Sequence, residues 1–103
     1  MKRAFSDNIE RIRALCIEHN VKSLYAFGSV CKKDENDAND VDLLISFNKM
    51  DYGEYADNYF SLADQLEALF NKPVDLVTKN SLHNPYFIDS VNKTKVLIYG
   101  SDD

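Results

Sequence analysis

Residues that could bind a metal ion and a phosphate group occur at a defined spacing in this 103-residue chain. Gly28 and Ser29 are followed, after ten residues, by Asp40 and Asp42. Alternate side chains of a strand face the same side, roughly 6.5–7 Å apart, so the two aspartates are expected to point together. Such carboxylates repel each other without a cation, and Mg²⁺ is usually held by one or two carboxylates plus substrate phosphates. The spacing therefore predicts a site for divalent metal ions.

A third carboxylate and the Gly28-Ser29 pair extend this prediction. Asp75 alternates with Val74 and Leu76 in a short predicted strand, so its side chain faces away from theirs. If that strand pairs beside residues 41–47, three carboxylates converge, as two-metal nucleotidyl or phosphoryl transfer requires. A glycine after a strand allows close approach of a ligand, and a helical turn opened by Ser29 would direct N–H groups at an anion. A Gly-Ser pair alone is typical of an ordinary turn, so its combination with the aspartates favours a nucleotide site.

Hydrophobic spacing predicts the elements that would position these residues. Ser6 is expected to cap a first helix that fades near His19 and Asn20. Further helices are expected after Asp51 and Asn84, which are both good N-cap residues. Strands are predicted over residues 21–27, 41–47, 74–77 and 95–99. The order predicts an α/β (α+β) fold with a small sheet, formed as a single domain over residues 1–103.

Charge and composition restrict the classes of partner. The net charge of −5 argues against binding of duplex nucleic acid or an anionic membrane surface, since phosphate contacts need Lys or Arg. No apolar run approaches the ~20 residues of a membrane span, and residues 1–7 lack the apolar core of a secretion signal. A cytoplasmic location is therefore expected, with Cys16 and Cys31 as free thiols.

Aromatic residues and one histidine are weighed separately. Tyr55 and Tyr59 lie on the apolar face of the helix after Asp51 and are expected to pack in the core. Tyr52 and Phe60 fall off that face and could form a partner or self-association surface, because such residues are enriched at interfaces. His19 is expected to cap a helix end or to face solvent.

The residues singled out above match a known family. Gly28-Ser29, ten further residues and Asp40-Val41-Asp42 reproduce the GSx10DxD signature of minimal nucleotidyltransferases of the DNA polymerase beta superfamily. The chain resembles this family over nearly its whole length. The resemblance implies a polymerase-beta-like fold with a mixed sheet flanked by helices, and ATP bound with Mg²⁺, with two ions expected.

The resemblance also implies a role for each site residue. Asp40 and Asp42 match metal ligands, and Asp75 matches a third carboxylate that shares a metal and helps to deprotonate the attacking hydroxyl. Gly28 and Ser29 match the family's contacts to the triphosphate. Lys32 is included among these contacts, because it keeps a positive charge where the family often has arginine.

The resemblance further suggests a partner. Many such small proteins are antitoxins, similar to enzymes that transfer AMP to a tyrosine of a HEPN-type ribonuclease toxin and silence it. Our first hypothesis is therefore an adenylyltransferase, a Mg²⁺-dependent nucleotidyltransferase that moves AMP from ATP to a hydroxyl of a partner protein.

Two alternatives remain open. The family often continues Gly-Ser with Arg-Ala-Arg-Gly, whereas this chain has Val30-Cys31-Lys32-Lys33. This departure motivates a second hypothesis, a catalytically weak or inactive module that neutralises its partner by binding. A third hypothesis is a transferase acting on a small molecule, but relatives of that kind carry further domains for the acceptor. The acceptor half would then come from another chain or a second copy, so a complex with a toxin or self-association is expected.

Overall fold

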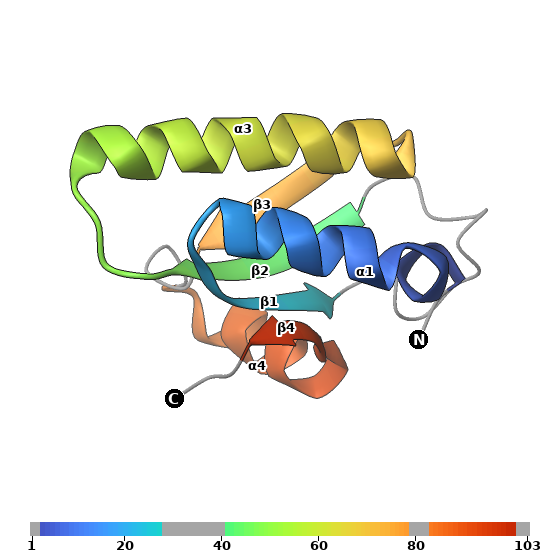
Figure 1. Ribbon diagram of the computed structural model, residues 1–103. Coiled ribbons are helices and arrows are strands. Elements are labelled where there is room, and N and C mark those ends of the chain that lie inside the picture. The colour runs from blue at the N-terminus through green and yellow to red at the C-terminus, as the bar shows by residue number, and fades with distance from the viewer. Residues whose placement is uncertain (1–2, 28–40, 79–82, 101–103) are drawn as a thin grey trace.

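The computed structural model describes residues 3–27, 41–78 and 83–100. In chain order, the elements in these ranges are helix α1 (Arg3–Glu18), strand β1 (Val21–Phe27), strand β2 (Val41–Phe47), helix α3 (Tyr52–Phe70), strand β3 (Val74–Thr78), helix α4 (Pro85–Thr94) and strand β4 (Val96–Gly100) (Figure 1). The predicted order of helices and strands is confirmed, with shifts of one residue or so at the ends of the last two strands.

The strands form one mixed sheet in the order β3-β2-β1-β4. Strand β1 pairs antiparallel with both β2 and β4, whereas β2 and β3 run parallel. The parallel connection is made by α3, in keeping with the need for a long crossover between parallel strands. The predicted α/β fold with a mixed sheet is therefore confirmed.

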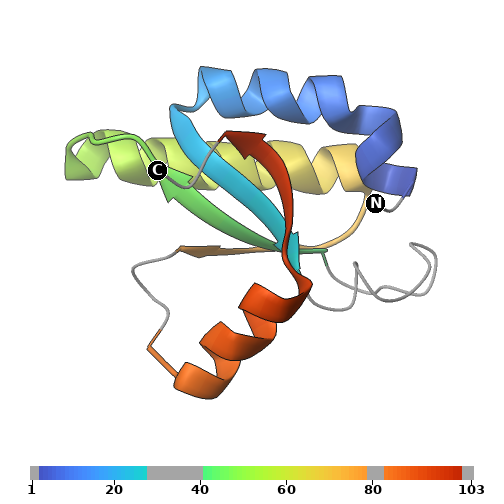
Figure 2. The same cartoon turned by 90° about the horizontal axis from the view of Figure 1, so that it is seen from below.

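Helices cover both faces of the sheet. Helices α1 and α3 lie on one face and α4 lies on the other (Figure 2). The larger hydrophobic core lies between the sheet and the first two helices, and its fully buried members include Ile12, Leu24, Leu43, Ile45, Leu62 and Leu66. A smaller cluster on the α4 side contains Tyr25, Phe27, Leu44 and Val91. Strands β1 and β2 contribute alternate residues to the two clusters, as the period of two predicts.

The ends of the helices test the predicted caps. Asp51 caps α3, with its Oδ1 accepting a hydrogen bond of 2.8 Å from the Glu54 backbone N–H. Asn84 caps α4, because its Oδ1 accepts hydrogen bonds from the backbone N–H groups of Tyr86 and Phe87. The cap predicted at Ser6 is wrong, because α1 begins at Arg3. A cap contributes only about 1 kcal/mol, and Arg3 and Ala4 are good helix formers that extend the helix upstream.

His19 joins α1 to α3 and is buried, so the predicted alternative of solvent exposure is wrong. Its Nδ1 lies 2.7 Å from the Leu15 carbonyl oxygen, to which it donates, so the predicted capping role is confirmed. That tautomer leaves Nε2 as an acceptor, 3.0 Å from Ser61 Oγ and 3.2 Å from Gln65 Nε2 on α3. The histidine is therefore a structural link between two helices.

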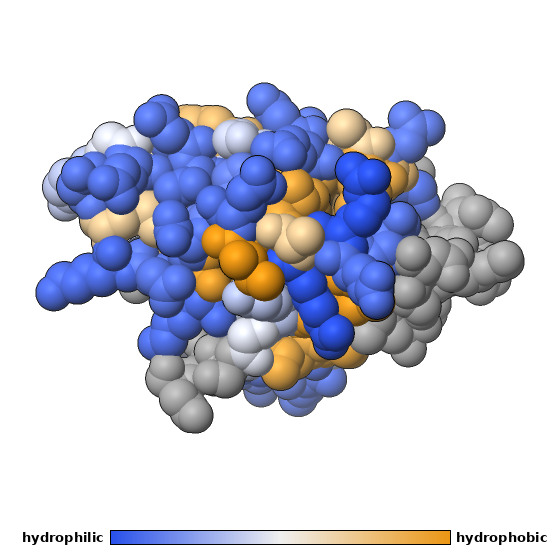
Figure 3. Space-filling model, in the orientation of Figure 1, coloured by the Kyte–Doolittle hydropathy of each residue, from blue (hydrophilic) through white to orange (hydrophobic). Residues whose placement is uncertain are grey.

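The outer surface of α1 and α3 is mainly hydrophilic, with small hydrophobic patches between the polar side chains (Figure 3). None of the helices in the described ranges is long and apolar enough to cross a bilayer. Cys16 is a free thiol within the core, and burial raises its pKa to about 12. Its thiol therefore stays protonated at neutral pH, as expected for a cysteine that fills space.

Candidate active site

A row of three paired residues crosses the sheet beside the predicted motif. Asp42 on β2 is the partner of Phe27 on antiparallel β1 and of Asp75 on parallel β3. Directly paired residues share a face of the sheet, and neighbouring strands lie about 4.8 Å apart. The expectation that Asp75 faces the same side as Asp42 therefore agrees with the observed pairing.

Two hydrogen bonds hold the starts of β2 and β3 in this register. The Val41 backbone N–H donates to the Pro73 carbonyl oxygen over 2.9 Å, immediately before Asp42. The Val74 backbone N–H donates to Glu67 Oε2 on α3, also over 2.9 Å, immediately before Asp75. The end of α3 is itself fixed by Asn71, which adopts a left-handed conformation with φ of 56°. The strands that carry the two aspartates are thus fixed, at the residue before each aspartate, by hydrogen bonds to α3 and to the α3–β3 connection.

The two faces of these strands differ sharply in polarity. Val41, Leu43 and Leu76 are buried against α1 and α3. On the opposite face Asp42 is half-buried and Asp75 is exposed. The carboxylates therefore lie on the α4 side of the sheet, where α1 and α3 do not cover them.

An aromatic contact borders the row on the α4 side. Phe27 is buried, and its ring centroid lies 5.8 Å from that of Phe87 in the first turn of α4. Val91 of α4 packs in the same small cluster as Phe27. Helix α4 thereby closes one side of the surface that carries Asp42 and Asp75.

The remaining predicted site residues lie outside the described ranges. These residues are Gly28, Ser29, Lys32 and Asp40. In the sequence, Gly28 follows Phe27 and Asp40 precedes Val41, so both motifs adjoin the ends of strands that the row connects. Among residues 3–27, 41–78 and 83–100, no group of three His, Cys, Asp or Glu side chains is placed to hold a metal ion. The described part of the site is thus a pair of carboxylates.

The chemistry of this pair suits a hard divalent cation. Two carboxylates on adjacent strands, separated by about one strand spacing, repel each other in the absence of positive charge. Mg²⁺ accepts oxygen ligands and commonly uses one or two carboxylates while substrate phosphates supply the rest. The donors present therefore fit Mg²⁺ bound together with a nucleoside triphosphate.

Tyr59 adds a feature that sequence reasoning did not identify. It was expected in the core, and it does pack against the core from α3, yet its hydroxyl reaches β3 and donates to the Leu76 carbonyl oxygen over 2.6 Å. Burial raises the pKa of Tyr59, and the negative charge of Asp75 raises it further. The hydroxyl therefore stays protonated and lies within electrostatic reach of a candidate metal ligand.

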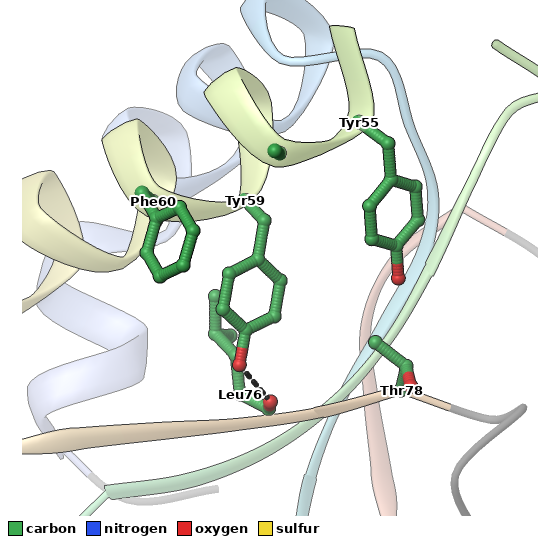
Figure 4. Close-up of a pocket in the computed structure, with 6 residues that line it drawn as sticks. Tyr55, Tyr59, Phe60, Leu76 and Thr78 are labelled. Carbon is green, nitrogen blue, oxygen red and sulfur yellow. Dashed lines mark hydrogen bonds between the residues drawn. The ribbon is translucent and has the colours of Figure 1, made fainter. Parts of the chain in front are cut away.

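The helix α3 aromatics form a groove that the sequence pattern did not reveal. The groove encloses a space of about 420 Å³ between α3 and β3 (Figure 4). It is lined by Tyr55, Ala56, Tyr59 and Phe60 of α3 and by Leu76 and Thr78 of β3. Tyr52 and Phe60 were predicted to lie off the core face, and they are 95% and 66% exposed. The prediction for Tyr52 and Phe60 is confirmed, whereas Tyr55 lines the groove and is only half-buried.

Comparison with known protein families identifies the class to which this site belongs. A family model described as "Polymerase beta, Nucleotidyltransferase" matches residues 10–103. The chain belongs to this nucleotidyltransferase family. The family predicted from the Gly28-Ser29 and Asp40-Val41-Asp42 motif is thus confirmed, as is the nucleotidyltransferase class of enzyme.

Relatives in the archaeon Methanocaldococcus jannaschii carry a more specific name. One, called a "Putative protein adenylyltransferase", is 31% identical over 81 residues, which span 79% of this chain and 80% of the relative. A second protein of the same name and organism is 35% identical over 83 residues, with the same coverage of both chains.

Solved structures share the fold. A structure described as a "putative minimal nucleotidyltransferase" matches with a TM-score of 0.71 and 26% identity, over 93% of this chain and 95% of the other. A tri-AMPylated HEPN toxin of Shewanella oneidensis in complex with its MNT antitoxin matches with a TM-score of 0.63 and 20% identity, over 93% of this chain and 72% of the other. A toxin–antitoxin complex with AMP-PNP matches with a TM-score of 0.65 and 21% identity, over 92% and 75%.

Proposed function

We propose that this nucleotidyltransferase moves AMP from ATP to a hydroxyl of a partner protein, with Mg²⁺ as its metal, and that the partner is a HEPN-type toxin silenced by the modification. The observation that carries the proposal is the pairing of Asp42 with Asp75, beside the residue that precedes Gly28-Ser29. The names of the relatives and the AMPylated toxin complex among the structural neighbours support the choice of reaction and partner.

Each site residue has a role under this proposal. Asp42 and Asp75, with Asp40 beside them in sequence, would hold two Mg²⁺ ions. Bound Mg²⁺ neutralises phosphate charge and aligns the reacting oxygens for in-line displacement. Gly28, Ser29 and Lys32 would bind the triphosphate with backbone N–H groups, a hydroxyl and a positive charge.

The bond changes follow from nucleotidyl transfer itself. The acceptor hydroxyl oxygen forms a bond to the α-phosphorus of ATP, and the bond from that phosphorus to the pyrophosphate oxygen breaks. Asp75 lies on the edge strand of the sheet and is exposed, so an acceptor can approach it from outside. Its carboxylate would accept the hydroxyl proton as the new bond forms.

The direct test is transfer of label from ATP labelled at the α-phosphate. The protein is incubated with Mg²⁺, labelled ATP and the product of the neighbouring gene, and the proteins are separated on a denaturing gel. Label is expected on the partner and should be absent when Mg²⁺ is chelated. The absence of label on any protein, with a folded enzyme and a partner that it binds, would contradict the proposed reaction.

The second hypothesis, neutralisation of the partner by binding alone, is motivated by the sequence that follows the Gly-Ser pair, Val30-Cys31-Lys32-Lys33. The double variant Asp40→Asn with Asp42→Asn separates the two functions in cells that express the toxin. Loss of protection, at unchanged abundance and partner binding, supports the enzyme. Full protection by this variant supports neutralisation by contact.

A further inference from the structure

We infer that the groove between α3 and β3 is a docking site for a basic segment of the acceptor protein that carries an apolar anchor residue. The inference rests on the proposed function, because it names the chemistry by which an acceptor would be held beside the site. The groove is lined by Tyr55, Ala56, Tyr59, Phe60, Leu76 and Thr78 (Figure 4). None of these residues belongs to the nucleotide motif.

The aromatic wall of the groove is already organised. The rings of Tyr55 and Tyr59 are stacked, with centroids 6.5 Å apart and an interplanar angle of 12°. Phe60 meets Tyr59 edge to face at 5.3 Å, and the hydroxyl of Tyr59 is anchored on the Leu76 carbonyl oxygen. A wall held by such contacts loses little conformational entropy when a ligand binds.

Phe60 supplies the apolar driving force. Its side chain is 66% exposed although it borders a groove large enough for a side chain of a partner. Removing exposed aromatic surface from water favours formation of a complex. Phenylalanine is enriched at protein interfaces, and the residues that contribute most to binding cluster in well-packed pockets.

The charge around the groove selects a basic partner. From Asp51 to Phe70 the sequence contains five Asp or Glu residues and no Lys or Arg. Four of these acidic residues, Asp51, Glu54, Asp57 and Asp64, are exposed. Lys or Arg side chains of a partner are attracted by the negative potential of these acidic residues and by the faces of the aromatic rings that line the groove. A second copy of this chain would bring the same acidic helix and a net charge of −5, so self-association at this surface is disfavoured.

The groove also lies next to the candidate site. Leu76 and Thr78 face the groove from β3, and Asp75 of the same strand faces the carboxylate row on the other side. The negative charge of Asp75 helps to raise the pKa of Tyr59, which lines the groove. A partner segment held in the groove would therefore be separated from the candidate site by the edge strand β3 alone.

Fluorescence anisotropy with a defined probe tests this surface. The probe is a short labelled peptide rich in lysine and arginine with one central leucine, and its matched control has glutamate at each basic position. The intact protein is expected to bind the basic probe and not the acidic one, and binding should weaken as salt is raised. Phe60→Ala is expected to weaken binding about tenfold or more, equal to about 1.4 kcal/mol.

Tyr52→Ala is the matched control variant, since Tyr52 is an exposed aromatic of the same helix that does not line the groove. It should leave the affinity within about twofold. Equal binding by Phe60→Ala and the intact protein, or equal binding of the acidic probe, would overturn the inference. A dimer in sedimentation that Phe60→Ala converts to monomer would overturn it too, because a second copy would then occupy the groove.

Calorimetry with ATP and Mg²⁺ on the same samples separates this inference from the proposed function. The intact protein and Phe60→Ala are both expected to bind nucleotide equally well. If the protein binds ATP but its groove does not bind the basic peptide, only the proposed docking surface is overturned. A protein that binds the basic peptide but no nucleotide overturns only the proposed reaction.

Discussion

Replacing Asp42 with asparagine is expected to lower the rate of AMP transfer by about 100-fold or more, equal to at least about 2.7 kcal/mol of transition-state stabilisation. The amide keeps the size of the side chain but loses the negative charge that a divalent cation needs. Asp42 is half-buried at the centre of the row between Phe27 and Asp75, so the substitution leaves Asp75 as the one carboxylate of the described row. The rate is measured with labelled ATP and the partner protein.

Glu10→Gln is the control, because Glu10 is exposed on α1, which covers the opposite face of the sheet from the carboxylates and does not line the groove. It should transfer AMP at nearly the rate of the unmodified protein. Circular dichroism should show both variants folded. An Asp42→Asn protein that transfers AMP as fast as Glu10→Gln would place the chemistry elsewhere in the chain.

Leu43→Ala is expected to reduce the free energy of unfolding by about 2–5 kcal/mol, because it opens a cavity in the larger core. Leu43 is fully buried in β2, immediately after Asp42, and packs between the sheet and the two covering helices. A loss of this size is a large part of the roughly 5–15 kcal/mol that stabilises an average domain. Urea unfolding followed by circular dichroism measures the change.

Leu97→Ala provides the comparison, since Leu97 lies on edge strand β4 and is 46% exposed. The same deletion of atoms there should cost much less than at Leu43. Equal losses for the two variants would mean that the core does not lie where the sheet and the two helices place it.

The local pattern of the sequence was sufficient to predict which way the key side chains point. Alternation in 41–47 separates Asp42 from Leu43, and alternation around Asp75 separates it from Val74 and Leu76, because strand geometry has a fixed period of two. The pairing of the two strands was a condition that the sequence left open. It depends on contacts between distant residues, such as the Val41 N–H with the Pro73 carbonyl oxygen.

The features that the sequence did not reveal also depend on distant contacts. The groove lies between α3 and β3, where the Tyr59 hydroxyl donates to the carbonyl oxygen of Leu76, seventeen residues further along. His19 is buried because Ser61, forty-two residues away, satisfies its Nε2 atom. The start of α1 was missed for a different reason, since several early residues are nearly equivalent as starting points. Hydrophobic spacing contains no information on any of these choices.

Paramagnetic broadening in NMR tests most directly whether a metal–nucleotide complex binds at the carboxylate row. Mn²⁺ is added with a non-hydrolysable ATP analogue, and excess Mg²⁺ serves to reverse the effect. The backbone amide signals of Phe27, Asp42 and Asp75 should broaden strongly. Those of Val21 and Phe47, which pair at the opposite end of β1 and β2 about 20 Å away, should stay sharp. Broadening centred on Val21 and Phe47, or no broadening at the row, would contradict the account.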